Sequence, residues 1–394
     1  MKKVLLRGPL LTASGYGEHA RQFFRWLETR KDIDLKVQCL NWGITTWYIN
    51  PDIEEGLIGR IMQKTNFDIK KENFDISIQI QLPDEWDNTL AKYNVGVSAF
   101  IETDRCTKKW FECCNKVDKV IVPSKHALNS ILAVGKPKTK VHVVNEPLNP
   151  LVTKKDKKFN LDLKTDFNFL VVSQLTDNSP ESDRKNIANT IKAFCENFEG
   201  NPDVGLVIKT NIGRSNTADR KNTKKLLEKI VKSSRKSEFP KVYMIHGLMS
   251  PGEMNGLYTH PKIKGLISLT RGEGYGLPIM EAAALEMPVI ATNWSGHLDF
   301  LKEFVKIDYS LKSIPDSKAD GRIFEKNTFW AEPSLDDFKK KSKDFVSRYS
   351  YHKSVAKKQS KKIRSNLSQS AFNKKMNEII QWAFGYLFQY LNCL

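Results

Sequence analysis

The stretch Arg271–Phe300 reads RGEGYGLPIMEAAALEMPVIATNWSGHLDF, and the fold of the chain is decided there. Just before it, Gly265–Leu269 form a short apolar run with a β-branched residue, which is typical of a buried strand. After the glycines, Met280–Leu285 are strong helix formers. The pattern predicts a strand, a glycine-rich turn and a helix in direct succession.

The glycine-rich turn is suited to an anion. Gly272, Gly274 and Gly276 allow the backbone to approach a ligand closely, and the start of the helix presents unpaired N–H groups with a positive dipole. Pro278 stands where a first-turn proline costs no hydrogen bond, so it fixes the start of the helix. The turn is therefore a candidate phosphate site.

Two carboxylates flank this turn. Glu273 precedes it and Glu281 follows about one helical turn later. Ionised carboxylates only accept hydrogen bonds, and sugar hydroxyls donate them, so a ligand with an anionic middle and hydroxyl-rich ends would fit. A nucleotide sugar has that shape. The alternative is a glycine loop that caps a helix between two solvated glutamates.

The spacing of Glu273 and Glu281 is an E-x7-E arrangement, and it comes with E-G-Y-G-L-P-I-M-E-A and, downstream, P-V-I-A-T. The whole pattern resembles the GT4-like retaining glycosyltransferases of the GT-B class, also called group 1 glycosyltransferases. The resemblance implies an α/β fold of two Rossmann-like doubly wound parallel-sheet domains that face a cleft, with a C-terminal helix crossing back. A length of 394 residues also favours two domains.

The expected domain boundaries follow from this resemblance and from the order of predicted elements. They are an N-terminal acceptor domain at 1–148, a linker at 149–165, a nucleotide-sugar domain at 166–365, and a helix at 366–394 that packs back on the first domain. Predicted strands are Lys3–Leu6, Leu35–Leu40, Phe74–Gln79, Val95–Phe100, Lys119–Val122, Val141–Val144, Phe167–Ser173, Val204–Lys209 and Val242–Ile245.

The helices expected from periodicity and capping signals connect these strands. They are Glu18–Thr29, a helix from an N-cap at Ser124 to Leu132, Asn186–Phe198, Thr217–Lys236, one starting at Ser250-Pro251 with Glu253 completing a capping box, Leu335–Leu367 and Phe372–Leu391. The last is amphipathic through Met376, Ile379, Ile380, Trp382, Phe384, Leu387 and Leu391, and we interpret it as core packing rather than a membrane anchor.

The first domain offers two groups of candidate site residues. The loop from Gly8 to Gly17 follows the first strand, where open α/β sheets bind ligands, so Gly15 and Gly17 are donor-binding candidates; an ordinary tight turn is the alternative. Glu102 and Asp104 follow a later strand, where many related enzymes place a histidine or an acid that faces the donor sugar. They are catalytic candidates, and helix capping by Thr103 or Asp104 is the alternative.

His126, in the first turn after Ser124, is expected at the surface, with a catalytic role as the alternative.

Cations for a diphosphate are expected in the second domain. Arg184 and Lys185 resemble the D-R-K-N version of the family's phosphate clamp, and Lys209 ends a strand. We expect Arg184 with either Lys185 or Lys209 to stabilise the departing diphosphate; the alternative is that each is a solvated surface cation. The loop at Leu248 resembles the family's base-binding loop, which reads the nucleobase through backbone groups.

The resemblance further implies a role for each part of the central turn. Glu273 contacts the donor-sugar hydroxyls, Glu281 holds the ribose, and the backbone of Gly274, Tyr275, Gly276 and Leu277 binds sugar and phosphate. The reaction would be retaining hexosyl transfer from a donor such as UDP-glucose or GDP-mannose, with no cofactor. Because cations replace the divalent metal, no metal site is expected, and Asp32-Ile33-Asp34 is discounted as one.

The acceptor is left open by the sequence. A saccharide or lipid-linked saccharide is expected, but the formal charge of +18 also suits phage-type glycosylation of a hydroxylated DNA base, or a non-catalytic polyanion-binding protein on the same fold. Lysine outnumbers arginine, which an AT-rich genome would produce without any polyanion partner. Phe329-Trp330-Ala331-Glu332-Pro333 resembles a W-x-E-P segment that follows the donor site in some of these enzymes.

The expected location is the cytoplasm, including the inner membrane face or a phage-infected host cell. The chain has no apolar run long enough for a membrane span, and Met1–Gly8 is too short an apolar start for a signal peptide. The six cysteines show no C-x-x-C spacing, which fits a reducing compartment; they are Cys39, Cys106, Cys113, Cys114, Cys195 and Cys393. The oligomeric state is left open.

Overall fold

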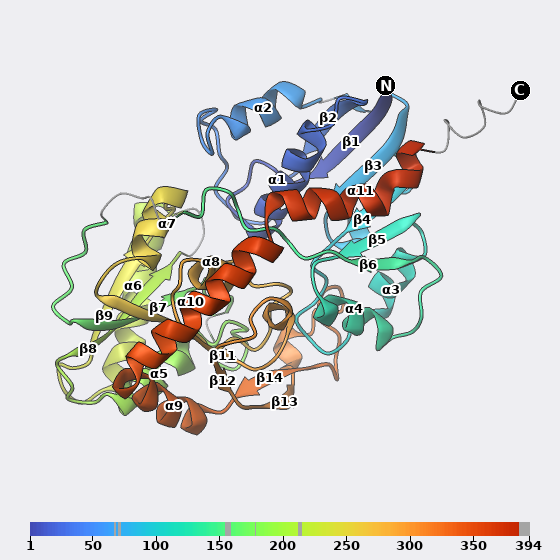
Figure 1. Cartoon of the computed structure of the whole chain (residues 1–394). Helices are drawn as coiled ribbons and strands as arrows, with labels where there is room; N and C mark the ends of the chain where they lie inside the picture. Colours follow the sequence, from blue (N-terminus) through green and yellow to red (C-terminus); the bar gives the residue numbers. More distant parts are fainter. Residues whose placement is uncertain (67, 70–71, 154–158, 178, 212–214, 386–394) are drawn as a thin grey trace, which may run out of the picture. The chain divides into compact units, whose positions relative to one another are not determined.

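The computed structural model describes residues 1–394 except 67, 70–71, 154–158, 178, 212–214 and 386–394, and at 381–385 it describes the backbone alone. The chain divides into two compact units (Figure 1). The first unit comprises Met1–Ile101, Arg105–Asn149 and the chain from Asn366 onward; the second comprises Glu102–Asp104 and Pro150–Ser365. The short segment Glu102–Asp104 therefore belongs with the later part of the sequence.

The first unit is built on six parallel strands in the order β2-β1-β3-β4-β5-β6. Val4, Leu5 and Leu6 are all completely buried, as expected of a parallel strand with both faces covered. The order reverses between β1 and β3, so loops at their carboxyl ends border a crevice. The strands are β1 Lys2–Gly8, β2 Ile33–Cys39, β3 Phe74–Ile80, β4 Ala91–Val97, β5 Lys119–Val122 and β6 Val141–Val143.

Five helices accompany this sheet in the part of the unit that the structure describes: α1 Gly15–Glu28, α2 Leu57–Lys64, α3 Lys108–Cys114, α4 Lys125–Leu132 and α11 Gln369–Gly385. Ser124 caps α4 as predicted, accepting from the Ala127 N–H. Helix α1 begins three residues before the expected Glu18, because Ser14 is its N-cap and accepts from the Gly17 N–H. Gly15 and Gly17 thus lie in the first helical turn.

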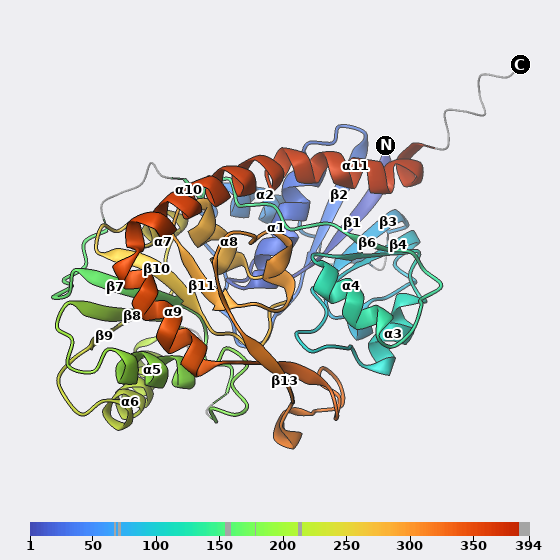
Figure 2. The same cartoon turned by 60° about the horizontal axis from the view of Figure 1, so that its bottom comes forward.

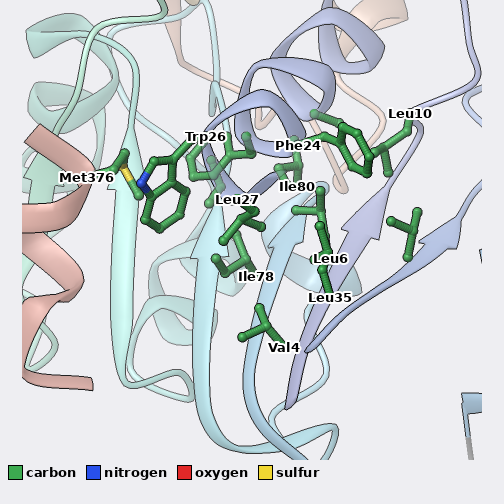
Figure 3. Packing of buried hydrophobic residues seen from close by; sticks show 14 of the residues in the cluster. Val4, Leu6, Leu10, Phe24, Trp26, Leu27, Leu35, Ile78, Ile80 and Met376 are labelled. Atoms are coloured by element: carbon green, nitrogen blue, oxygen red, sulfur yellow. The ribbon is translucent and has the colours of Figure 1, made fainter. Parts of the chain in front are cut away.

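Helix α11 contributes to the core of the first unit, as predicted for its described part (Figure 3). Phe372 and Met376 are buried, and the Phe372 ring meets the edge of Phe23 at a centroid distance of 5.2 Å. The Trp26 Nε1–H donates to Asn377 Oδ1 at 2.9 Å. The side chains of Trp382, Phe384, Leu387 and Leu391, also expected on this face, lie outside the described residues.

The second unit holds another six-stranded parallel sheet, in the order β12-β11-β10-β7-β8-β9. Numbered from β7, this is the dinucleotide-binding order 3-2-1-4-5-6, and the order reverses between β7 and β10. The strands are β7 Phe167–Val172, β8 Val204–Thr210, β9 Lys241–His246, β10 Ile263–Ser268, β11 Val289–Thr292 and β12 Val305–Ile307. Two such sheets confirm the predicted α/β class with two Rossmann-like sheets.

The helices of the second unit are α5 Ile187–Asn197, α6 Thr217–Ser234, α7 Pro251–Tyr258, α8 Leu277–Ala284, α9 Leu335–Ser347 and α10 Tyr349–Asn366. The capping box of Ser250 and Glu253 is formed as predicted. The helical stretch expected from Leu335 to Leu367 is confirmed, but it forms two helices: the backbone leaves the helical region at Arg348, so α9 buries Phe345 and α10 buries Ile363 separately.

A two-stranded antiparallel sheet, β13 Tyr309–Ser313 and β14 Phe329–Pro333, was not expected. Figure 2 shows β13 apart from strands β7–β9 of the same unit. All five residues of β13 are exposed, so this strand has no buried face of the kind that marks the strands of the main sheets. The W-x-E-P segment is part of β14, with Trp330 almost fully buried.

Candidate functional site

The candidate site forms at the reversal point of the second sheet. The loop after β7 carries Arg184 and Lys185, and the loop after β10 carries Glu273. Because β7 and β10 are parallel neighbours, both loops leave from the same edge of the sheet. Ligands of open α/β sheets bind in the crevice at this position.

Lys185 and Glu273 form the central ion pair of the site. The Lys185 Nζ donates to both carboxylate oxygens of Glu273, at 2.6 and 2.7 Å. Burial opposes ionisation of Glu273, but Lys185 and then Arg184 outweigh it and lower the pKa of that carboxyl. Glu273 is therefore an ionised acceptor at neutral pH, which suits hydroxyl donors.

Arg184 adds a second carboxylate to this cluster. Its Nη2 lies 3.1 Å from Glu102 Oε1, and its Nη1 donates to the Gly272 carbonyl at 2.6 Å. A Cβ on Gly272 would lie 2.3 Å from the Glu102 carbonyl oxygen, so glycine allows this close approach. Arg184, Lys185, Glu273 and Glu102 thus make one group of two cations and two acids.

Asp104 is paired with β14. Its backbone N–H donates to the Phe329 carbonyl at 2.8 Å, and its Oδ1 accepts from the Phe329 N–H at 2.7 Å. The alternative that Thr103 or Asp104 caps a helix is wrong, because Thr107 is the N-cap of α3 and accepts from Trp110. In this structure Asp104 anchors the Glu102 segment to β14.

Arg271 ties the site together, and sequence reasoning missed it. Its guanidinium donates to both carboxylate oxygens of Glu332, at 2.8 and 3.1 Å, and to the carbonyls of Pro180 and Asp183, at 2.6 and 2.8 Å. Its backbone N–H donates to the Arg184 carbonyl at 2.9 Å. Arg271 is 2% exposed. With its partners it forms a clamp that fixes the loop carrying Arg184 and Lys185. Glu332, the glutamate of the W-x-E-P segment, was the sequence signal that could have pointed to Arg271.

The glycine turn leads directly into α8. Gly276 is the N-cap, with a left-handed φ of 102° that favours glycine, and Pro278 occupies the first turn as predicted. Tyr275 is buried, and its ring packs against Phe300 at 5.1 Å between centroids. The Tyr275 side chain is therefore part of the core of the second unit.

Glu281 is oriented from α7. The hydroxyl of buried Tyr258 donates to Glu281 Oε2 at 3.1 Å. Burial and the Glu281 charge raise the pKa of Tyr258 well above its ordinary value, so the phenol keeps its proton and remains a donor. One Glu281 oxygen is fixed by this bond.

Lys209 makes a different contact from Arg184 and Lys185. Its Nζ donates to the Gly247 carbonyl at 2.7 Å, next to Leu248, a residue that is 48% exposed. Burial lowers the pKa of Lys209 to about 8. Among the described residues, no hydrogen bond or ion pair joins Lys209 to Glu273. Lys209 therefore belongs to the Leu248 loop, whereas Arg184 and Lys185 belong with Glu273.

The remaining candidates lie in the first unit. Gly17 approaches Thr12 so closely that a Cβ would lie 2.2 Å from the Thr12 carbonyl, and Gly15 shares its helical turn. His126 is half-buried in the first turn of α4. The five cysteines in the described part of the chain are free thiols, and Cys393 lies outside it.

The described residues show neither a metal-binding cluster nor a membrane-spanning helix. No group of three histidine, cysteine or acidic side chains there could hold a metal ion, and Asp32 is instead paired with Arg30 at 2.9 Å. Among the helices described, none combines the length and apolar character needed to cross a membrane.

Residues 153–317 match a sequence model of the family described as "Glycosyl transferases group 1". A comparison of the sequence with curated proteins gives no match. The matched segment contains β7 to β12 and both loops of the candidate site. The resemblance to group 1 glycosyltransferases is thereby confirmed over this segment.

Solved structures show the same two-domain fold. Sucrose-phosphate synthase from Thermosynechococcus elongatus is 12% identical, with a TM-score of 0.60 and coverage of 98% of this chain and 100% of that one. Anabaena HepE in complex with UDP and glucose is 10% identical, with a TM-score of 0.59 and coverage of 97% and 100%.

A third similar structure is a TarM variant from S. aureus, solved with fondaparinux, α-GlcNAc-glycerol and UDP. It is 15% identical, with a TM-score of 0.50, and the match covers 79% of this chain but only 55% of TarM. At these identities the similarity shows the fold, and it confirms the expected GT-B class.

Proposed function

We propose that this chain, whose residues 153–317 match the group 1 glycosyltransferases, transfers a hexose from a nucleotide diphosphate sugar to an acceptor hydroxyl with retention of configuration. The observation that carries the proposal is the Arg184, Lys185, Glu273 and Glu102 group at the reversal point of the second sheet. It stands beside a glycine turn and a helix start that suit phosphate.

Three parts of the second unit bind the different groups of the nucleotide sugar. Glu273, ionised at neutral pH, accepts hydrogen bonds from sugar hydroxyls, and Glu281, fixed by Tyr258, accepts them from the ribose. The backbone of Gly274–Leu277 and the α8 start bind phosphate oxygens. Backbone groups near Leu248 read the base, with a uracil or guanine nucleotide as the candidates.

Arg184 and Lys185 supply the charge for the leaving group. In the structure they are neutralised by Glu102 and Glu273, so an arriving diphosphate competes with carboxylates for the same N–H donors. As the bond from the anomeric carbon to the phosphate oxygen breaks, negative charge grows beside these cations. This is the work a divalent metal does elsewhere, and we expect turnover to be insensitive to chelators.

Retention follows from attack on the same face that the leaving group departs from. The acceptor oxygen forms the new bond to the anomeric carbon, and its proton passes to the departing phosphate oxygen, so atoms and charge balance. Asp104 anchors the Glu102 segment to β14 in this scheme.

The acceptor we propose is a saccharide or lipid-linked saccharide. The net charge of +18 favours a second candidate, a hydroxylated base in DNA, because it would offset backbone phosphates. A glycan acceptor gives products in a saccharide screen, whereas a DNA acceptor gives them only with hydroxymethylated DNA.

The test is a donor panel of UDP-glucose, UDP-GlcNAc, UDP-galactose and GDP-mannose, with thermal stabilisation and slow hydrolysis measured in the presence of EDTA. One donor should stabilise the protein and be hydrolysed, and Glu273→Gln should lower its hydrolysis about 100-fold. Glu238→Gln, a glutamate with a 71% exposed side chain, is the matched control and should leave hydrolysis unchanged.

The same panel can reject the proposal. If no donor stabilises the protein and none is hydrolysed, the non-catalytic polyanion-binding alternative is favoured. If hydrolysis stops in EDTA and returns with a divalent cation, the metal-independent part of the proposal is wrong while the transfer activity stands.

A further inference from the structure

Ser295 has a backbone conformation that only glycine adopts readily. Its φ is 91° and its ψ is −163°, and the residue is 5% exposed. This region of backbone angles is sterically hindered for any residue with a Cβ, so the chain holds Ser295 under strain. Asn293–Ser295 join β11 to the short helical turn Gly296–Asp299, so the next residue, Gly296, begins that turn.

The side chain of Ser295 contacts the candidate site directly. Its Oγ accepts from the backbone N–H of Glu273 at 2.9 Å. The Gly296 N–H donates to the Glu273 carbonyl, also at 2.9 Å. Both backbone polar groups of Glu273 are therefore bound by consecutive residues of one loop.

The two loops are also in direct contact. A Cβ on Gly296 would lie 2.1 Å from the Gly274 carbonyl oxygen, so no larger residue fits there without displacing the glycine turn. From the other side, the Lys185 ammonium holds the Glu273 carboxylate. Backbone and side chain of Glu273 are thus held by separate partners. The Gly296 anchor is a backbone N–H, whereas the Ser295 Oγ anchor can be removed by a side-chain substitution.

We infer that Ser295 is a positioning residue for Glu273, holding its backbone so that the carboxylate meets the donor-sugar hydroxyls. The inference rests on the proposed function, because it takes Glu273 to contact the sugar. In the part of the chain that the structure describes, the Ser295 hydroxyl bonds to the backbone of Glu273, which is at the sugar end of the proposed donor site. Removing the Ser295 hydroxyl should therefore affect the sugar end of the donor and spare the nucleotide end.

Two variants distinguish the effect of the Ser295 hydroxyl from the effect of the backbone strain. Ser295→Ala removes the hydroxyl and keeps the strained Cβ, whereas Ser295→Gly removes both. We expect Ser295→Gly to melt about 2–4 °C above Ser295→Ala, because glycine adopts this backbone freely. If Ser295→Ala does not fold, Ser295→Gly alone still tests the role of the hydroxyl. Ser233→Ala, an exposed serine on α6, is the matched control.

The decisive readouts are donor-sugar turnover and stabilisation by UDP. We expect both variants to lower kcat for donor hydrolysis about 10- to 100-fold, as a small displacement of a positioned group does. The shift in melting temperature with saturating UDP should stay within about 1 °C of the wild-type shift, which corresponds to a small change in affinity.

Three results would overturn or redirect this inference. Wild-type turnover in Ser295→Gly would show that the hydroxyl is not needed. A loss of UDP stabilisation in step with turnover would show that the loop has only a structural role. If the wild-type protein hydrolyses none of the four donors and is not stabilised by UDP, the proposed function itself fails, and the inference that rests on it fails too.

Discussion

At the scale of single residues, the charged side chains of the site depend on one another. Lys185 and Glu273 are both mostly buried, with side-chain exposures of 19% and 12%. A buried ion pair is costly to break, because removing one partner leaves the other charge uncompensated. Stability should therefore report on the pair directly.

Lys185→Met should lower the free energy of unfolding by about 3 kcal/mol, because the Glu273 carboxylate would remain buried beside Arg184 alone. Adding Glu273→Gln should recover about half of that loss, and the coupling in the double-mutant cycle should be about 1–3 kcal/mol. Urea unfolding of the four proteins measures it. Lys224→Met on α6, 65% exposed, is the control, and an equal effect of the two lysine changes would contradict the prediction.

Lys209 gives a pH dependence of stability. Burial lowers its pKa to about 8 in the folded state, whereas the unfolded chain releases this proton near its ordinary pKa of about 10.4. Between these values the unfolded state binds more protons, so stability rises with pH. From pH 8 to 10 the wild type should gain on the order of 2 kcal/mol relative to Lys209→Met.

Urea unfolding of both proteins at pH 7, 8, 9 and 10 checks this. Because the other titrating groups are shared, they cancel in the difference between the two proteins. Parallel profiles would show that Lys209 keeps its charge up to pH 10.

At the scale of elements, β14 and the loops after β7 and β10 act as one body through Arg271. The Arg271 guanidinium joins Glu332 of β14 to the carbonyls of the loop that carries Arg184. A planar fork is needed for both oxygens of Glu332, which a lysine cannot supply. The position of the diphosphate cations therefore depends on a strand pair outside the main sheet.

Arg271→Lys should lower donor hydrolysis about 10- to 100-fold, because the loop of Arg184 and Lys185 would shift while both cations remain. Steady-state hydrolysis of the donor found in the panel measures it. Arg348→Lys, paired with Asp344 at the surface, is the matched control. Equal activity of the two variants would show that the clamp does not position the cations.

At the scale of the whole molecule, the net charge of +18 makes the salt dependence of activity a way to distinguish a saccharide acceptor from a DNA acceptor. With a neutral saccharide acceptor, transfer should change less than about threefold between 50 and 200 mM NaCl, because only the donor is charged and its partners are buried. Binding to DNA through six or more phosphates would weaken about 1,000-fold or more over the same range. Transfer to a saccharide and filter binding of hydroxymethylated DNA, each measured at both salt concentrations, check this.

The sequence by itself determined the local features of this protein. Buried parallel strands, the Ser124 and Ser250 caps and the start of α8 each depend on residues within one turn or one strand, so periodicity and capping rules predicted them. The E-x7-E arrangement of Glu273 and Glu281 is also local in sequence, and it was identified from its resemblance to a known family. The predicted start of α1 was a few residues late. The break between α9 and α10 at Arg348 was not predicted.

Only the tertiary structure decided which distant residues meet. Lys185 and Glu273 are 88 residues apart, and Arg271 and Glu332 are 61 apart. Strand order brings the loops of β7 and β10 to one edge, and local sequence does not encode strand order. The same holds for β14, which binds Asp104 and thereby brings Glu102 to Arg184, because long-range pairing is selected by the packing of the whole unit rather than by any single segment.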